Sequence, residues 1–158
     1  MKKILCLIPM LFIMAACTED ESMETNYYLS LMGESDTWEL TGYEMMLTSD
    51  GEKAGNGKLS MKEVDEYISD SFSFRTHAVV GREDTVIHGS SVSGRTDIAQ
   101  QTTGTVEGKG GNPITLDNVS NIYMTVEWWD MDKNEKVQER IELYRKPENG
   151  GTFLDGEG

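Results

Sequence analysis

Apolar residues recur at every second position along most of this chain, which is the pattern of β-strands rather than of helices. The clearest case runs from Ile122 to Trp128, where the even-numbered side chains are apolar. Similar patterns cover 38–47, 58–62, 72–80, 86–92, 100–106, 122–128 and 137–143. The sequence therefore predicts an all-β fold, an antiparallel two-sheet sandwich of about seven strands with an immunoglobulin-like topology, and a small barrel is the alternative.

Two local features modify this pattern. The apolar parity changes from even to odd across Gly42, which predicts a β-bulge because glycine tolerates the extra residue. Ser60 and Glu63 fit a helix capping box, so a short helix over 61–68 competes with a turn over 63–66. We favour the turn.

The last two strands are predicted to form a hairpin around Lys133 and Asn134. Centring the turn on these residues places Val126 opposite Ile141 in the core. It also places Glu127 opposite Arg140 on the solvent-exposed face of the sheet, and such an opposite-charge pair stabilises an antiparallel register.

The first residues of the chain have the layout of a bacterial export signal. Lys2 and Lys3 precede an apolar run that is too short to span a membrane, and this run ends in Met14-Ala15-Ala16-Cys17. This tetrapeptide resembles a lipobox, in which the cysteine is acylated with diacylglycerol and becomes the first residue after cleavage. We therefore expect residues 1–16 to be a lipoprotein signal peptide and Cys17 to be the lipidation site. The alternatives are a plain secretory signal and an N-terminal anchor.

The segments on either side of the patterned region have no sustained period. We expect 17–36 to be a flexible acidic tether, 37–146 to be the β-sandwich domain and 147–158 to be a disordered tail.

The composition restricts the partners. The full chain has 14 Lys and Arg against 28 Asp and Glu, and removal of the signal leaves a charge of −16. Nucleic acid is therefore not an expected partner, because phosphate binding needs a basic surface. The membrane is expected to be reached through the lipid on Cys17, with the acidic domain repelled from anionic head groups.

The two histidines form the main candidate for chemistry. A turn over 81–84 would place His77 opposite His88 on neighbouring strands, close enough for both imidazoles to reach one metal ion. Zinc normally takes three or four protein ligands, so Asp84 or another carboxylate would have to complete the site. A solvent-facing pair is the simpler interpretation, and we expect no cofactor.

Three weaker candidates remain. Asp130, Asp132 and Asn134 resemble the opening of a calcium loop, but Glu135 and Ile141 occupy positions that need Gly and Glu, so a polar turn is the better interpretation. The segment 108–113 is rich in glycine but lacks the spacing of a phosphate loop. Trp129 is predicted to point away from the core and is a possible contact residue.

Three stretches carry a resemblance to a known group: Gly33-Glu34-Ser35-Asp36-Thr37-Trp38, then Ala54-Gly55-Asn56-Gly57, then the strand from Ile122 to Trp129. Together they resemble small uncharacterised lipoproteins of Bacillus-type Gram-positive bacteria, over about 33–146. The resemblance implies attachment to the extracytoplasmic face of the cell membrane, and it supplies no activity or catalytic residue. Export to the surface of a Gram-negative bacterium is the alternative location.

The function expected from these observations is that of a membrane-anchored extracytoplasmic lipoprotein. We expect a non-catalytic binding or interaction module, with an unknown protein or small molecule as its ligand, rather than an enzyme. The alternative is a metal-handling or hydrolytic protein centred on His77 and His88.

Overall fold

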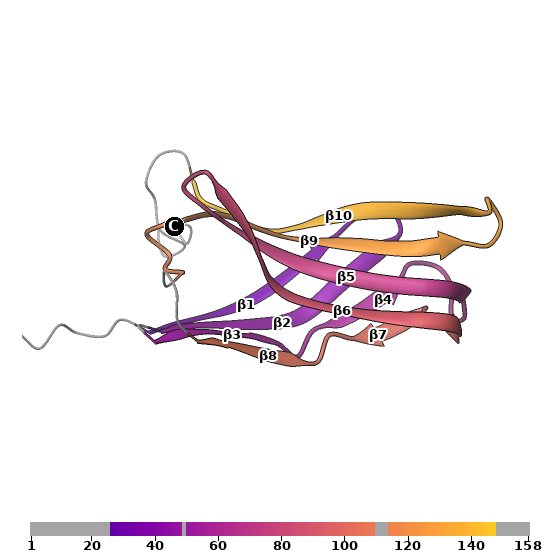
Figure 1. Ribbon diagram of the computed structural model, residues 1–158, viewed down its shortest axis with the longest axis horizontal. Helices are drawn as coiled ribbons and strands as arrows, with labels where there is room; N and C mark the ends of the chain where they lie inside the picture. The colour runs from indigo at the N-terminus through magenta and orange to yellow at the C-terminus, as the bar shows by residue number, and fades with distance from the viewer. Residues whose placement is uncertain (1–25, 49, 110–113, 148–158) are drawn as a thin grey trace, which may run out of the picture.

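The structure is a computed structural model that describes residues 26–48, 50–109 and 114–147. Within these ranges the chain forms ten strands in two antiparallel sheets, which pack face to face as a sandwich (Figure 1). The predicted all-β sandwich is confirmed, whereas its immunoglobulin-like class stays a prediction. The described residues contain no helix long and apolar enough to cross a membrane. The predicted signal peptide and Cys17 lie outside the described residues, as does the tail beyond Pro147.

The first sheet has six strands arranged around β2. β1 pairs with one edge of β2, while β3 and β4 share its other edge and pair in turn with β8 and β7. The strands are β1 (Tyr27–Glu34), β2 (Trp38–Thr48), β3 (Gly51–Gly55), β4 (Lys58–Met61), β7 (Gln100–Thr102) and β8 (Thr105–Lys109). Short breaks at Asn56-Gly57 and Thr103-Gly104 bend this sheet, and they lie side by side because the Asn56 N–H donates to the Gly104 carbonyl.

The second sheet has four strands in the order β10-β9-β5-β6. They are β5 (Ile68–Val80), β6 (Glu83–Asp97), β9 (Val119–Asp130) and β10 (Glu135–Arg145). Two hairpins build this sheet, since β5 pairs with β6 and β9 pairs with β10. The central contact is the pairing of β5 with β9.

The core lies between the two sheets and includes a cluster of three aromatic rings around Trp38. Trp38 on β2 is fully buried, and its ring centroid lies 5.5 Å from that of Phe72 on β5 and 5.6 Å from that of Trp128 on β9. Aromatic pairs at these distances stabilise a core beyond the area that they bury. The two sheets are therefore held together by aromatic side chains contributed from both layers.

Both local features of the sequence pattern are confirmed. Gly42 has a φ of 62°, and an irregularity in the β1–β2 pairing lies between Leu31 and Gly33 on the opposite strand. Residues 38 and 40 before it and 43, 45 and 47 after it are all buried, so the bulge restores the apolar side chains to the core. Residues 62–65 form a turn and bend without a helix.

The predicted tether is wrong over 27–34, which form β1 in the six-stranded sheet. Tyr27, Leu29 and Leu31 face the core, but exposed Tyr28 and Met32 alternate with them, so both faces contain apolar residues and the period is hidden. β3 was also not predicted, because Ala54 is its only apolar side chain and one residue cannot show an alternation. Any linker from Cys17 therefore ends by Tyr27.

The predicted register of β9 and β10 is wrong by two residues. Val126 lies opposite Glu139, Met124 lies opposite Ile141, and Glu127 lies opposite Gln138. This pairing centres the hairpin between Asp132 and Lys133. Its turn includes Asn134, which has a φ of 53°. A two-residue shift keeps every side chain on its face, and for that reason the predicted core positions survive.

Candidate binding surface on the four-stranded sheet

A row of polar and aromatic side chains crosses all four strands on the outer face of the four-stranded sheet. It contains Asp84 on β6, His77 on β5, Tyr123 on β9 and Arg140 on β10. The His77 Nδ1 atom lies 2.9 Å from the Asp84 Oδ1 atom, and the Tyr123 hydroxyl donates to the other carboxylate oxygen of Asp84. One carboxylate thus connects three strands.

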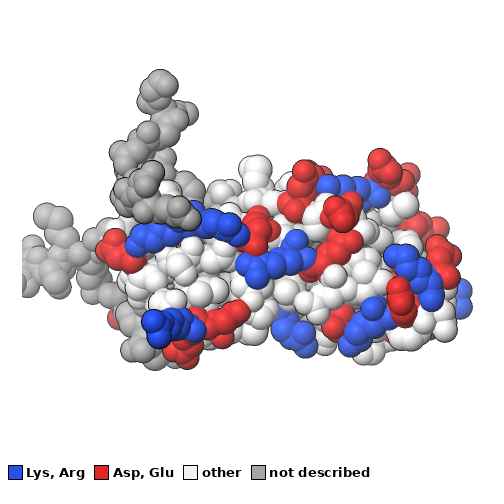
Figure 2. Space-filling view, turned by 90° about the horizontal axis from the view of Figure 1, so that it is seen from above, with Lys and Arg blue, Asp and Glu red and all other residues white. Residues whose placement is uncertain are grey.

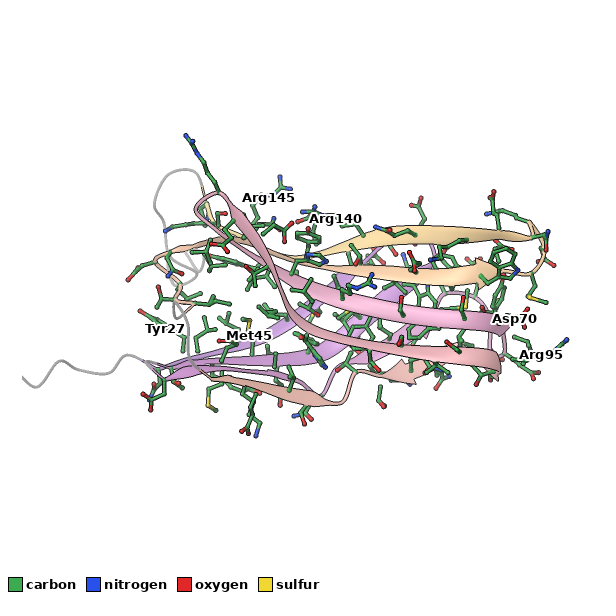
Figure 3. All side chains as sticks on the ribbon, in the orientation of Figure 1. Tyr27, Met45, Asp70, Arg95, Arg140 and Arg145 are labelled. Atoms are coloured by element: carbon green, nitrogen blue, oxygen red, sulfur yellow. The ribbon has the colours of Figure 1, made fainter. Side chains whose placement is uncertain are left out.

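The rings in this row are layered. The His77 and Tyr123 rings are stacked, with centroids 4.5 Å apart and an interplanar angle of 8°. The Arg140 guanidinium carbon lies 3.4 Å from the Tyr123 ring centroid, a cation–π contact. Tyr123 is consequently only 7 % exposed, although it lies on the outer face. Figure 3 places Arg140 and Arg145 on the side of β10 that faces away from the six-stranded sheet.

The polar network continues from Arg140 along β9 and β10. Arg140 donates to the carboxylate of Glu142 and, over 3.2 Å, to the amide oxygen of Asn121. The Asn121 amide in turn donates to Glu142 over 2.9 Å. Figure 2 shows acidic and basic side chains interspersed over this side of the molecule, without a field of one sign.

The electrostatics of the row keep it ordered. The hydrogen bond from Tyr123 lowers the pKa of Asp84, with a smaller contribution from His77. Burial, followed by the contact with Asp84, raises the pKa of Tyr123. Around neutral pH, Asp84 is therefore an anion and Tyr123 keeps its proton, which it donates to Asp84. This arrangement orients an imidazole on a sheet face, and it suits recognition of a polar partner.

The predicted pairing of His77 with His88 is wrong. His77 lies opposite Val86, and His88 lies opposite Thr76 on the other face of the sheet. The turn contains only Gly81 and Arg82, and a register shift between Thr76 and His77 then moves His88 inward. The juxtaposition behind the predicted metal site is therefore absent, and the described residues contain no group of three or more His, Cys, Asp or Glu that could hold a metal ion.

His88 instead connects the two sheets from within the sandwich. It is 6 % exposed, and its Nδ1 atom lies 2.9 Å from the Tyr43 hydroxyl on β2. Its ring stacks on Tyr43 and meets Phe74 edge-on, and it also forms a hydrogen bond with the backbone of Thr103. Burial raises the pKa of Tyr43 to about 12, so the Tyr43 hydroxyl keeps its proton beside the His88 ring.

We expect His88 to make the fold sensitive to acid. Burial lowers the pKa of His88, and its described ring contacts include no acidic side chain that could offset a positive charge. The unfolded chain takes up this proton near pH 6.5, whereas the folded chain takes it up only at lower pH. The contribution of the neutral His88 ring to the free energy of unfolding is complete above about pH 6.5. It is lost as the pH falls through the pKa of His88 in the folded chain.

Chemical unfolding between pH 7 and 5 checks this expectation. The unfolding free energy of the wild type should fall over this range more steeply than that of His88→Gln. The His88 ring should stay neutral at the pH where an unfolded histidine titrates, so its NMR chemical shifts should not change there. Titration of His88 at or above pH 6.5 would contradict the expectation.

The stretch Gly33-Glu34-Ser35-Asp36-Thr37-Trp38 connects β1 to β2 and is fixed to β10 by a structural clamp of hydrogen bonds. Glu139 on β10 accepts hydrogen bonds from the Ser35 hydroxyl (2.6 Å), the Thr37 hydroxyl (2.6 Å) and the Thr37 N–H (2.9 Å). Lys62 donates to the Ser35 carbonyl over 2.7 Å and pairs with Glu34. No local signal indicates Glu139, because it lies 102 residues beyond Thr37 in the sequence.

The calcium-like segment forms a turn, in agreement with the preferred interpretation. The Asp130 Oδ1 atom accepts from the N–H groups of Asp132 and Lys133 and from the Tyr67 hydroxyl. The hydrogen bond from Lys133 is the largest contribution that lowers the pKa of Asp130. These contacts are those of an aspartate that stabilises its own turn.

The remaining candidates are placed as follows. Trp129 is half-buried on β9, opposite Lys136, so its position as a contact residue stays a prediction. The glycine-rich segment extends β8 to Lys109, and 110–113 lie outside the described residues. A shallow hollow of about 220 Å³ on the six-stranded sheet was not predicted, and Met46, Thr48, Asp50, Gly51, Glu52, Lys53, Glu107 and Gly108 line it.

No family model, curated protein or solved structure matches this chain.

Proposed function

We propose that this chain is a lipid-anchored extracytoplasmic protein that acts as a non-catalytic interaction module. The observation that carries the interaction role is the free edge of β6, the outer strand of the four-stranded sheet. Among the described residues no strand pairs with this edge. An unpaired strand edge offers N–H and C=O groups that a partner strand can use.

The anchoring role is supported by the short distance between Cys17 and the fold. The sandwich begins at Tyr27, ten residues after Cys17. Extended chain spans at most about 3.6 Å per residue, so the start of β1 would lie within about 36 Å of the acylated cysteine. Two or three acyl chains hold a protein firmly at a membrane. We place it on the extracytoplasmic face of the cell membrane.

The strand order also supports the immunoglobulin-like topology. β10, β9, β5 and β6 correspond to strands G, F, C and C′ of that fold, and β2, the β3/β4 line and the β7/β8 line correspond to A, B and E. The chain passes between the sheets after β4, after β6 and after β8, as Greek-key connections require. In this proposal β1 is an added N-terminal strand.

Replacement of Cys17 by serine tests the anchor. Because only a thiol is acylated at this position, Cys17→Ser should abolish incorporation of labelled palmitate and prevent cleavage of the signal peptide, which leaves a longer precursor. The matched control is Cys6→Ser, since Cys6 would leave with the signal peptide and its loss should change neither readout. A Cys17→Ser protein that is still labelled would overturn the proposal.

A further inference from the structure

β1 is held much less tightly in its first half than at its end. The first half, residues 27–32, has one buried side chain, that of Leu31. Tyr27 and Leu29 are only partly buried against the core, and the Tyr28 hydroxyl makes an exposed hydrogen bond to a side chain of β2. Among the described residues, this half pairs with β2 alone. Few contacts therefore hold the first half of β1 in the sheet.

The end of β1 is fixed to two other parts of the fold. An added Cβ on Gly33 would lie 2.8 Å from a side chain of β10 and still closer to a carbonyl oxygen of that strand, so β1 and β10 are in contact there. Glu34 pairs with Lys62 over 2.8 Å, and the hydrogen bonds of the clamp at Glu139 follow directly. The tightly held part of the chain therefore begins at Gly33.

A break in the pairing separates these two parts of β1. The register of β1 on β2 shifts between Leu31 and Gly33, and the hydrogen bonds of the clamp all lie beyond this shift. A segment with few buried apolar contacts opens locally at much less than the free energy of global unfolding. Residues 27–32 can thus leave β2 without breaking the clamp.

We infer that residues 27–32 separate from β2 while the clamp stays closed, and that this half of β1 is a reserve of linker stored in the sheet. Tyr27 lies ten residues after Cys17, and release up to Gly33 adds six more. At 3.6 Å per residue, the reach from the acylated cysteine to the fixed part of the fold would grow from about 36 Å to about 58 Å. The lengthening rests on the proposed anchor, whereas the separation of the strand does not.

Native-state hydrogen exchange of the full chain in detergent, measured by NMR, tests the separation. The amides of 27–32 that bond to β2 should exchange at least about tenfold faster than those of Ser35 and Thr37, because opening of the clamp needs more free energy. The amide of Ser35 donates to the Trp38 carbonyl and that of Thr37 donates to Glu139. Equal exchange on the two sides of Gly33 would overturn the inference.

A disulfide across β1 and β2 provides the matched comparison. Ser30 lies opposite Glu44, so Ser30→Cys combined with Glu44→Cys should fasten the first half of β1 to β2 when the protein is oxidised. Oxidation should slow the exchange of 27–32 to the rate at the clamp, and reduction should restore it. Ser30→Cys alone is the control and should show neither change. Exchange that the disulfide leaves as fast as before would count against opening of this half.

Energy transfer from a dye on Asp70→Cys to labelled lipid head groups, in vesicles that carry the acylated protein, tests the lengthening. Figure 3 places Asp70 at the end of the sandwich opposite Tyr27. Leu31→Gly removes the buried side chain of the first half and should lower the transfer, because the sandwich then reaches further from the membrane. Met32→Gly removes a side chain that is 68 % exposed and should leave the transfer unchanged.

The outcomes of this measurement separate the lengthening from the anchor. Equal transfer for Leu31→Gly and Met32→Gly would overturn the lengthening of the tether. A wild-type protein that is absent from the vesicles would overturn the anchor, and with it the lengthening, while the exchange rates would still decide whether the strand separates.

Discussion

A Trp38→Ala variant should lose about 3–5 kcal/mol of unfolding free energy, the usual cost of truncating a buried tryptophan. Trp38 is fully buried and contacts Phe72 and Trp128, so its loss removes aromatic packing between the sheets. The cavity would lie between the two sheets. Backbone hydrogen bonds hold each sheet together, so the sheets can collapse into the cavity only in part.

The matched control is Trp38→Phe. The indole Nε1 of Trp38 is buried and has no hydrogen-bond partner among the described residues, so its removal breaks no hydrogen bond there. Phenylalanine keeps a ring against Phe72, and the variant should lose less than half as much as Trp38→Ala. Urea unfolding followed by far-UV circular dichroism measures both. Equal losses for the two variants would contradict this account.

A Gly55→Ala variant should be destabilised by at least about 3 kcal/mol, because overpacking and backbone strain act together. Gly55 has a φ of 145°, a conformation that L side chains rarely adopt. An added Cβ would also lie 2.6 Å from the Thr105 Cα atom and still closer to the Gly104 carbonyl oxygen. Both contacted atoms belong to the backbone, one in β8 and one in the break before it. A change of side-chain rotamer therefore cannot relieve either contact.

Gly42→Ala separates these two causes. Gly42 also has a positive φ, of 62°, but a Cβ there would have nothing within 4 Å. This variant should cost only the left-handed strain of about 1–2 kcal/mol. Thermal and urea unfolding of the two variants give the comparison. A Gly55→Ala protein as stable as Gly42→Ala would show that the bent six-stranded sheet has room that the structure does not indicate.

The glycines of the stretch Ala54-Gly55-Asn56-Gly57 have a structural role at the bend. A Cβ on Gly57 would lie 2.9 Å from the Tyr43 ring, and Tyr43 contacts His88. Gly55 and Gly57 thus let the bent sheet approach both its neighbouring strand and the core. Their role is structural, as is that of the clamp at Glu139.

The candidate surface could be predicted only in part. The sequence indicates both His77 and Asp84, and the structure brings their side chains together. His88 does not belong to this group, because the turn spans two residues and not the four that the sequence predicts. Tyr123 and Arg140 were not recognised as members, since nothing near them in the sequence indicates which strands lie side by side.

The local alternation of side chains was sufficient to predict the all-β class, the two-layer sandwich, the bulge at Gly42 and most of the core. Each of these depends on which face of its own strand a residue occupies, and neighbours in the sequence carry that information. Registers, edges and long-range contacts depend instead on turn geometry and on partners far along the chain. Only the tertiary structure therefore separated His77 from His88, joined Glu139 to the turn after β1, and left the edge of β6 without a partner strand among the described residues.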